Sequence, residues 1–380
     1  MSTGAPAGGV TLQVNVAPTD LPHASLTLAQ QLTQWGGQVD DVIFVLDLHK
    51  SAGPRGADFD ERVDGMRALM AEMTRAGLGA RSVIVDYSPE ALVQVADRFF
   101  DGVVPPLKDC AGAPFFAYFY GLAMAQTRYV LHLDCDVLFG GGSQTWIGEA
   151  CELLRARTDV LFVSPLAGPP TDDGRIPSRA RRAQRRTQEF GSQPILESST
   201  PRAYRLRHVS SRVFLADLRR LREAGPFEVL DAPPWTHGSD LATTPFLPVE
   251  TVLSSTMKSG GWLRVDLLGE GPGMWFLHPG QRGPAFAANL PNLIDAVQRD
   301  EVPSEQRGDY ELLDAWLDSV GPERIERAST PLSFGQRLRR VARAVGLGVV
   351  RNAIWRVRWH WSRSGAVRGL RRKIGHGEHG

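Results

Sequence analysis

The stretch YVLHLDCDVLFGG, residues 129–141, is a short apolar run that ends in two carboxylates, Asp134 and Asp136, separated by one cysteine. The length and composition of its first part predict a buried strand over 129–134. Two carboxylates at the mouth of a strand repel one another and lose hydration, so both stay ionised only beside a cation or strong donors. Mg²⁺ or Mn²⁺ meets that need, because these ions prefer hard oxygen ligands and often share them with substrate phosphates. The pair indicates phosphate chemistry, although the same spacing also arises by chance.

Strand and helix patterns alternate on both sides of this stretch. Apolar runs and helical spacings predict three earlier strands (10–16, 41–49, 80–88) and three helices (23–35, 59–77, 114–126). Downstream, a strand, a helix and a Gly-Pro stop are expected in 208–227, then a helix at 248–262, a strand at 263–269 and a loop at 270–280. This alternation is typical of an α/β fold with a mostly parallel central sheet and helices on both faces.

Three of the expected strands finish with an acidic residue, namely Asp47, Asp86 and Asp134. The carboxyl ends of parallel strands line the ligand crevice of such a sheet, so these side chains are candidates for nucleotide binding. The alternative is that each aspartate starts a turn or caps the next helix.

Composition and charge limit the class of protein. With 380 residues, 42% hydrophobic and 22% charged, the chain has room for one large α/β domain or two ordinary ones. We expect no membrane span and no secretion signal, because no apolar stretch reaches about 18 residues and the N-terminus lacks a basic segment followed by an apolar core. The three cysteines show no metal-type spacing, which favours a reduced, cytoplasmic setting.

The net charge of +1 hides a basic tail, because residues 337–380 sum to +11 and residues 1–336 to −10. Arginines there are mixed with Trp355, Trp359 and Trp361 and with aliphatic residues at helical spacing. This pattern predicts a basic amphipathic helical tail that attaches peripherally to the anionic inner face of a membrane. The alternatives are docking on an acidic protein surface and nonspecific binding of nucleic acid, the partner that we expect least.

The segment from Gly121 to Phe139 resembles the helix, strand and D-x-D motif of GT-A fold glycosyltransferases, particularly the inverting family 2 group. VNVAPTD (14–20) is similar to that family's first-strand loop against the nucleotide base, which implies that Pro18, Thr19 and Asp20 bind the nucleotide sugar. IFVLDLHKS (43–51) resembles the second strand, and Asp47 inherits its contact with base or ribose. The family's usual Asn-x-Gly is replaced by Phe119-Tyr120-Gly121.

PVETVLSSTMKSGGW (248–262) is similar to the family's acidic helix start followed eleven residues later by glycine. The resemblance implies that Glu250 is the general base that deprotonates the acceptor hydroxyl. Val249-Glu250-Thr251 departs from the usual Glu-Asp dipeptide, and Glu250 could instead only cap the helix. His278 in FLHPG falls where many GT-A enzymes supply a histidine to the metal, which implies Asp134, Asp136 and His278 as ligands of Mn²⁺ or Mg²⁺. A lone histidine is more often structural.

The remaining candidates concern the acceptor. In DAPPWTHGSD, Trp235, His237 and Asp240 suit stacking on and hydrogen bonding to a sugar, although the loop could simply be packed. Six arginines from Arg175 to Arg186 could clamp a pyrophosphate or lipid phosphate, or form a solvated loop. The expected organisation is a disordered start (1–9), a nucleotide-sugar half (10–141), an acceptor half (142–330) with an Arg-rich excursion (165–205), and the tail (331–380).

Together these features predict a metal-dependent enzyme of the hexosyltransferase type. It would transfer a sugar, with inversion, from a nucleotide-diphosphate donor to a glycan, lipid-linked or small-molecule acceptor. Two alternatives stay open. LHLDCDVLF also resembles the first motif of haloacid-dehalogenase phosphohydrolases, in which the first aspartate is the nucleophile. The altered motifs also suit a noncatalytic scaffold that binds nucleotide sugars.

Overall fold

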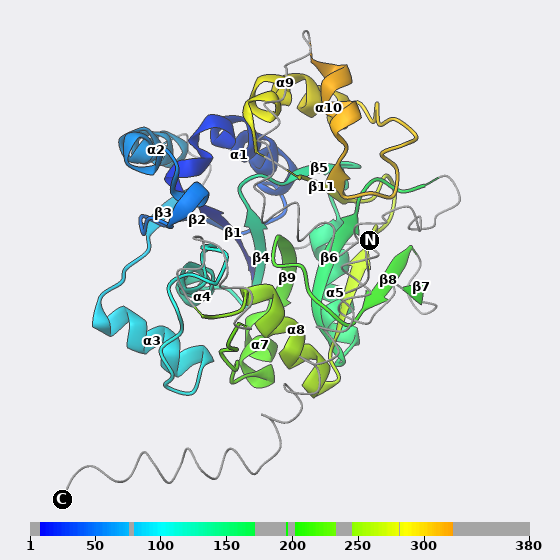
Figure 1. Ribbon diagram of the computed structural model, residues 1–380. Coiled ribbons are helices and arrows are strands. Elements are labelled where there is room, and N and C mark those ends of the chain that lie inside the picture. Colours follow the sequence, from blue (N-terminus) through cyan, green and yellow to red (C-terminus); the bar gives the residue numbers. More distant parts are fainter. Residues whose placement is uncertain are drawn as a thin grey trace, which may run out of the picture. The chain divides into compact units, whose positions relative to one another are not determined.

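A central sheet runs through the computed structural model, with strand order β3–β2–β1–β4–β9–β6–β10–β8–β7 (Figure 1). Its strands are β1 (Val10–Val16), β2 (Asp41–Leu46), β3 (Ala80–Ile84), β4 (Tyr129–Asp134), β6 (Val160–Ala167), β7 (Ile195–Leu196), β8 (Ala203–Leu206), β9 (Val213–Asp217) and β10 (Leu263–Leu267). The structure describes residues 8–75, 80–171, 195–196, 202–232, 245–280 and 282–321. They belong to the first of the two units into which the chain divides, 1–325 and 326–380.

Strand directions confirm the mostly parallel sheet. β3, β2, β1 and β4 are parallel neighbours, and β6 is parallel to β10. β9 lies antiparallel between β4 and β6, and β8 lies antiparallel between β10 and β7. The two expected halves of the chain therefore share one sheet, joined where β9 pairs with β4.

Local hydrogen bonds explain where two of the strands, β2 and β3, end. β1 and β4 have the expected bounds, whereas β2 and β3 stop at Leu46 and Ile84, before the expected ends. In both cases an aspartate turns the chain: Asp47 accepts a bond from the amide of His49, and Asp86 accepts one from the amide of Ser88, each at 2.8 Å. Asx turns of this kind compete with the strand ladder.

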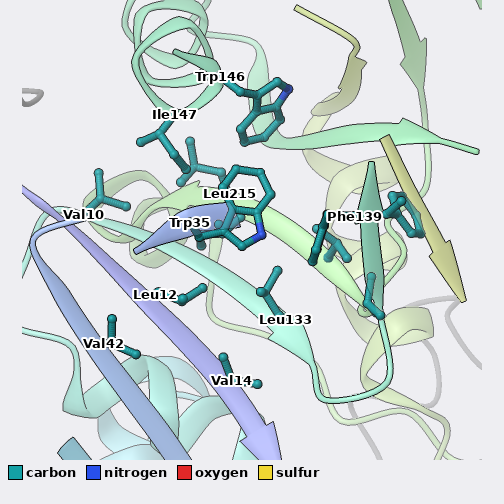
Figure 2. Packing of buried hydrophobic residues seen from close by; sticks show 14 of the residues in the cluster. Val10, Leu12, Val14, Trp35, Val42, Leu133, Phe139, Trp146, Ile147 and Leu215 are labelled. Atoms are coloured by element: carbon teal, nitrogen blue, oxygen red, sulfur yellow. The ribbon is translucent and has the colours of Figure 1, made fainter. Parts of the chain in front are cut away.

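Helices cover both faces of the sheet, as expected. α1 (Leu21–Trp35), α2 (Phe59–Arg75) and α5 (Trp146–Ala156) share one buried cluster with β1 and β4, which Figure 2 shows around Leu12, Trp35 and Trp146. α3 (Pro89–Phe99), α4 (Phe116–Met124), α7 (Leu218–Ala224) and α8 (Val249–Gly260) share the cluster on the opposite face. None of the helices in the described ranges is long and apolar enough to cross a bilayer.

A third apolar cluster forms outside these two layers. It contains β5 (Leu138–Gly140), β11 (Trp275–Pro279), α9 (Pro284–Gln298), β12 (Glu311–Leu312) and α10 (Asp314–Val320). The expectation of a loop over 270–280 was wrong for its second half, because β11 pairs with β5, β6 and β12. Two short 3₁₀ helices, η1 (Pro18–Asp20) and η2 (Gly53–Gly56), follow β1 and β2.

Candidate active site

The ladder between β5 and β11 brings Asp136 and His278 together. β11 runs antiparallel to β5 and pairs Leu277 with Leu138, so His278 lies beside the residues that precede β5. Nε2 of His278 is 3.4 Å from Oδ2 of Asp136. Two of the three predicted metal ligands are therefore in contact, although about 140 residues separate them in the sequence.

The glycines after the acidic pair permit this ladder. A Cβ on Gly140 would lie 2.1 Å from Cζ2 of Trp275, across the strand pair. Gly141 has a φ of +89°, which L side chains rarely adopt. The FGGG sequence is thus explained by the close approach of β11 to β5 and by the left-handed backbone conformation at Gly141.

Arg282 is a second partner of Asp136, beside His278. Its Nε is 3.2 Å from Oδ2 of Asp136, and its Nη1 is 2.6 Å from Oδ1 of Asp20. Both carboxylates are buried, with 2% and 6% of their residue surface exposed. Burial alone would raise the pKa of Asp136, but His278 and Arg282 hold that pKa well below its usual range.

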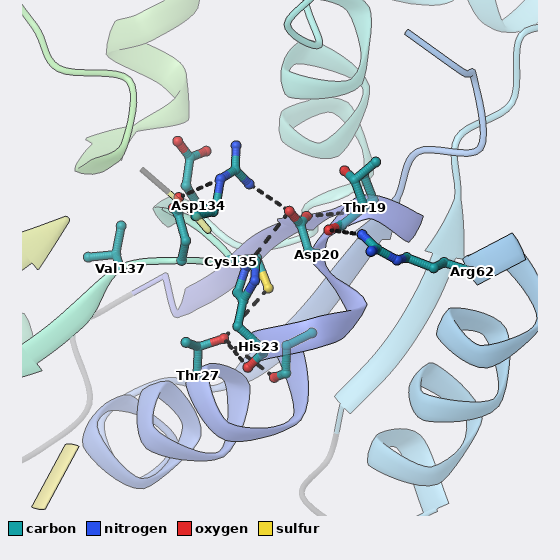
Figure 3. A network of polar contacts seen from close by, with 12 residues as sticks. Thr19, Asp20, His23, Thr27, Arg62, Asp134, Cys135 and Val137 are labelled. Atoms are coloured by element: carbon teal, nitrogen blue, oxygen red, sulfur yellow. Dashed lines mark hydrogen bonds and ion pairs between the residues drawn. The ribbon is translucent and has the colours of Figure 1, made fainter. Parts of the chain in front are cut away.

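Asp20 and His23 extend the same cluster at the start of α1. Figure 3 shows Asp20, His23, Cys135 and Asp134 gathered where η1 and α1 meet the end of β4. Asp20 accepts a bond from the amide of Ala17 at 2.9 Å, and its Oδ1 is 3.8 Å from Nε2 of His23. Burial raises the pKa of Asp20 to about 6 in spite of Arg282, and burial lowers the pKa of His23 to about 4.

Asp134 stands at the end of β4 and keeps part of its side chain, 26%, exposed. Its Oδ1 accepts a hydrogen bond of 2.6 Å from the hydroxyl of Tyr118, on α4. Its amide donates to the carbonyl of Arg212 at 2.8 Å. One carboxylate oxygen is therefore held by the protein at the edge of the sheet where the resemblance implies a ligand.

Glu250 lies in the first turn of α8, which begins after Pro248 and ends at Gly261 in the left-handed conformation. Burial would lower the pKa of Arg212, but Tyr310 and the carboxylates of Glu250, Asp134 and Asp136 raise it. Glu250 also raises the pKa of the buried Arg264, whose main partner is Asp266. Arg212 thus lies within electrostatic range of the predicted base and of both aspartates of the acidic pair.

Asp47 is engaged in a separate buried cluster at the end of β2. Nζ of Lys108 lies 2.6 Å from its Oδ2, and the hydroxyl of Tyr87 donates to its Oδ1 at 2.7 Å. The ring of His49 is 5.3 Å from that of Tyr87. A base or ribose at this point would meet Lys108 and Tyr87 together with Asp47.

The other predicted residues fall in three groups. Pro18 and Thr19 form η1 beside Asp20, and the Thr19 carbonyl accepts a bond from Arg62 at 3.4 Å. Asp86 is exposed and bonds to the amide and hydroxyl of Ser88, the N-cap of α3, so its turn-forming role is the one observed. Several predictions lie outside the described residues: Trp235, His237 and Asp240, the run Arg175–Arg186, and the basic tail.

The donor types at the acidic edge suit a divalent ion, because Asp134 and Asp136 offer hard oxygens and His278 an imidazole nitrogen. Within the described ranges, however, no three His, Cys, Asp or Glu side chains are arranged as a group that could hold a metal ion. Arg282 lies against Asp136 instead. A divalent ion at Asp136 would therefore compete with Arg282 for the same carboxylate oxygen.

The sequence interpretation missed several residues of these clusters, among them Tyr118, Arg212, Arg282 and Lys108. Tyr118 sits in the aromatic run PFFAYFYG, which reads as an apolar helix face and conceals one hydroxyl aimed at Asp134. Arg282 follows the predicted histidine by four residues in HPGQRG. This short distance in the sequence was the signal that could have indicated that Arg282 lies near the site. Nothing local to Arg212 or Lys108 distinguishes them from surface cations.

No protein-family model matches the chain, and no curated protein matches it. The solved structures similar to it include the mannosyltransferase PcManGT from Pyrobaculum calidifontis with GDP-Man and Mn²⁺ (13% identity, 97% of this chain and 89% of that chain, TM-score 0.39). Glucosyl-3-phosphoglycerate synthase from Mycobacterium tuberculosis with Mg²⁺ and UDP is 13% identical over 77% of this chain and 78% of that one, with a TM-score of 0.35. GalNAc-T7 with UDP, GalNAc and Mn²⁺ is 9% identical over 71% of this chain, which spans 44% of its length, with a TM-score of 0.38.

These similar structures are glycosyltransferases that were determined with nucleotides and with Mn²⁺ or Mg²⁺. Since their TM-scores are all below 0.5, the function of this chain has to be inferred from its own residues.

Proposed function

We propose that the chain is a glycosyltransferase that uses a nucleotide-diphosphate sugar and a divalent cation, with Asp134, Asp136 and His278 as the cation's ligands. The observation that carries the proposal is the contact of Asp136 with His278 at the carboxyl edge of the sheet, two residues from Asp134. A buried carboxylate kept ionised at this edge suits binding of a cation that carries a diphosphate.

Glu250 is the proposed general base. Its place in the first turn of α8 favours the ionised carboxylate, because a helix N-terminus carries partial positive charge. Deprotonation of the acceptor hydroxyl by Glu250 lets the oxygen attack the anomeric carbon from the face opposite the diphosphate, which inverts the sugar's configuration. When bound, the cation would stabilise the negative charge of the departing nucleoside diphosphate.

Asp20 and Asp47, at the ends of η1 and β2, are the proposed contacts to the nucleotide. Asp47 with Lys108 and Tyr87 offers both donors and an acceptor for a base or ribose. Asp20 accepts a hydrogen bond from Arg282, and Arg282 also contacts Asp136, a proposed ligand of the cation that would carry the diphosphate. The acceptor is proposed to be a glycan, a lipid-linked sugar or a small molecule.

A panel of UDP-, GDP-, ADP- and dTDP-sugars tests the proposal. With Mn²⁺ present, one donor class should raise the melting temperature, since a ligand that binds the folded state stabilises it. That donor should then be hydrolysed or transferred by the purified protein, and the anomeric configuration of the product reports inversion or retention. Tight nucleotide binding without turnover of any donor would favour the scaffold alternative.

No described contact favours the phosphohydrolase alternative. Its nucleophile would be Asp134, but Oδ1 of Asp134 is held by the Tyr118 hydroxyl, and the strand that ends there is the fourth rather than the first. Metal-dependent hydrolysis of a generic phosphate ester that is lost in Asp134→Asn would support it.

For localisation we propose a cytoplasmic protein whose tail, 331–380, attaches to an anionic membrane surface. The support is the charge of +11 over residues 337–380 and the three tryptophans among those arginines.

A further inference from the structure

A row of polar side chains crosses the face of the sheet that α4 covers. Gln13 and Asn15 on β1 pair in register with His132 and Asp134 on β4. Because alternate residues of a strand point to the same face, the four lie together on one side. Gln13 and His132 are fully buried there. Polar groups in such a place need partners, since leaving a buried donor or acceptor unpaired is costly.

Tyr118 is the residue of α4 that reaches this row. Its hydroxyl donates to Oδ1 of Asp134 at 2.6 Å, and its backbone carbonyl accepts a bond from Gln13. The hydroxyl can therefore offer its proton to Asp134.

His132 lies near the same carboxylate oxygen, Oδ1 of Asp134. Its ring lies between those of Tyr118 and Phe214, with centroid distances of 4.6 and 4.9 Å. Neither ring nitrogen has a hydrogen-bond partner among the described residues, yet Nε2 lies 3.6 Å from Oδ1 of Asp134. This fully buried imidazole therefore has its Nε2 near Oδ1 of Asp134 but just outside hydrogen-bond distance.

We propose that Tyr118 and His132 are positioning residues that hold Oδ1 of Asp134 from the α4 side, so that Oδ2 is presented to the bound cation. Among the described residues, Oδ2 receives no hydrogen bond, which leaves it for a ligand. The inference rests on the proposed function, because it assumes that Asp134 is a ligand. It goes further by assigning two residues that no sequence motif marks. Groups that orient a metal ligand typically change metal affinity 10- to 100-fold when they are lost.

The test compares Tyr118→Phe with Tyr129→Phe in the full-length protein. Both changes remove one buried phenolic hydroxyl, but that of Tyr129 has no hydrogen-bond partner among the described residues. Mn²⁺ binding is measured by electron paramagnetic resonance, in the presence of UDP, as the loss of the free-ion signal. Tyr118→Phe should weaken Mn²⁺ binding about tenfold and alter the spectrum of the bound ion, whereas Tyr129→Phe should leave both unchanged.

Two further variants separate orientation from packing. His132→Phe keeps a ring in the stack, and His132→Gln keeps a donor, so Gln should retain Mn²⁺ affinity better than Phe does. In an Asp134→Asn background, Tyr118→Phe should have no further effect on Mn²⁺ affinity. Equal Mn²⁺ affinity in Tyr118→Phe and wild type, whatever their melting temperatures, would overturn the inference. A wild-type protein that binds Mn²⁺ with none of UDP, GDP, ADP and dTDP would overturn the proposed function, and the inference with it.

Discussion

Nε of Arg282 lies 3.2 Å from Oδ2 of Asp136, so the buried carboxylate of the acidic pair is already neutralised by another residue of the same chain. The same guanidinium also pairs with Asp20 at 2.6 Å. A cation that enters the site therefore meets carboxylates that are already paired.

Arg282→Gln should bind Mn²⁺ more tightly than wild type when no nucleotide is present. Removing the competing cation from a partly exposed pair is expected to yield about a tenfold gain in affinity, or about 1.4 kcal/mol. Isothermal titration calorimetry measures it directly, and Mn²⁺ should raise the melting temperature of the variant more than that of wild type. Arg299→Gln, which removes an exposed arginine paired with Glu301, is the matched control. Unchanged or weaker Mn²⁺ binding by Arg282→Gln would contradict competition.

Glu250→Gln should reduce sugar transfer by about 100- to 10,000-fold, the usual contribution of a general base, while donor and Mn²⁺ binding persist. The change keeps the size of the side chain and removes its basicity. Transfer rates at saturating donor, beside nucleotide affinity, measure the two effects. Glu152→Gln on the exposed surface of α5 should behave as wild type. A variant that retains full transfer would reassign the base.

The lowered pKa of His23 predicts an acid-sensitive fold. Burial first, with Arg282 and Arg62, lowers that pKa to about 4 in the folded protein against 6.5 in the unfolded chain. Below pH 6.5 the unfolded chain binds a proton that the folded one does not, so acidification favours unfolding until about pH 4. This contribution amounts to about 2 kcal/mol between pH 7 and 4.5.

His23→Gln should remove that contribution. Unfolding by urea is measured at pH 7, 5.5 and 4.5. As the pH falls, the free energy of unfolding of wild type should decrease more than that of the variant. Asp20, whose pKa is raised to about 6, acts in the opposite sense over the same range, so the comparison must be made between variants rather than within one curve. Parallel pH profiles for both proteins would show that His23 protonates equally in both states.

Gly121→Ala should destabilise the protein by about 1–3 kcal/mol, the usual cost of overpacking. A Cβ there would lie 2.3 Å from Nε2 of Gln13 and 2.9 Å from Cγ2 of Val45, which forces α4 away from the sheet. Gly148→Ala in α5 is the control, because its Cβ would meet nothing within 4 Å and a helical alanine is favourable. Thermal unfolding of the two variants should therefore shift in opposite directions.

Full-length protein should sediment with vesicles that contain anionic lipid, and a chain ending at residue 335 should not. Each Lys or Arg near such a surface contributes about 1 kcal/mol, so binding should fall steeply as salt rises. Equal sedimentation of both proteins would remove the membrane proposal, and binding of the full-length protein to neutral vesicles would show that charge is not its basis.

The strands β1, β2, β3 and β4 of the central sheet could be predicted because their signal is local, whereas β7 and β8 lie in the range 165–205 that was expected to be an irregular excursion. β1 and β4 are short, largely apolar stretches between turn signals, and their bounds agree with the expected ones. β11 was predicted as a loop because WFLHP is short and follows a glycine-rich turn; pairing with β5 makes it a strand.

The aspartates and the histidine of the candidate site could be predicted from the sequence, whereas its arginine and its tyrosine could not. Asp134, Asp136 and His278 follow strand patterns or a family motif that can be read in one dimension. Arg282 acquires its role from Asp20, 262 residues earlier, and Tyr118 acquires its role from the alignment of α4 over β4. Contacts of this kind are created by folding, so no window of the sequence contains them.

β11 and the loop that follows it carry both His278 and Arg282. β11 packs in the third apolar cluster through Trp275 and Leu277 and in the cluster of α1 and β1 through Phe276. Local segments of a protein can open with a lower free energy than the whole fold. Opening of this one segment would withdraw both partners, His278 and Arg282, from Asp136 at once. Hydrogen exchange at the amides of β11 would then measure how often the folded protein lacks a complete site.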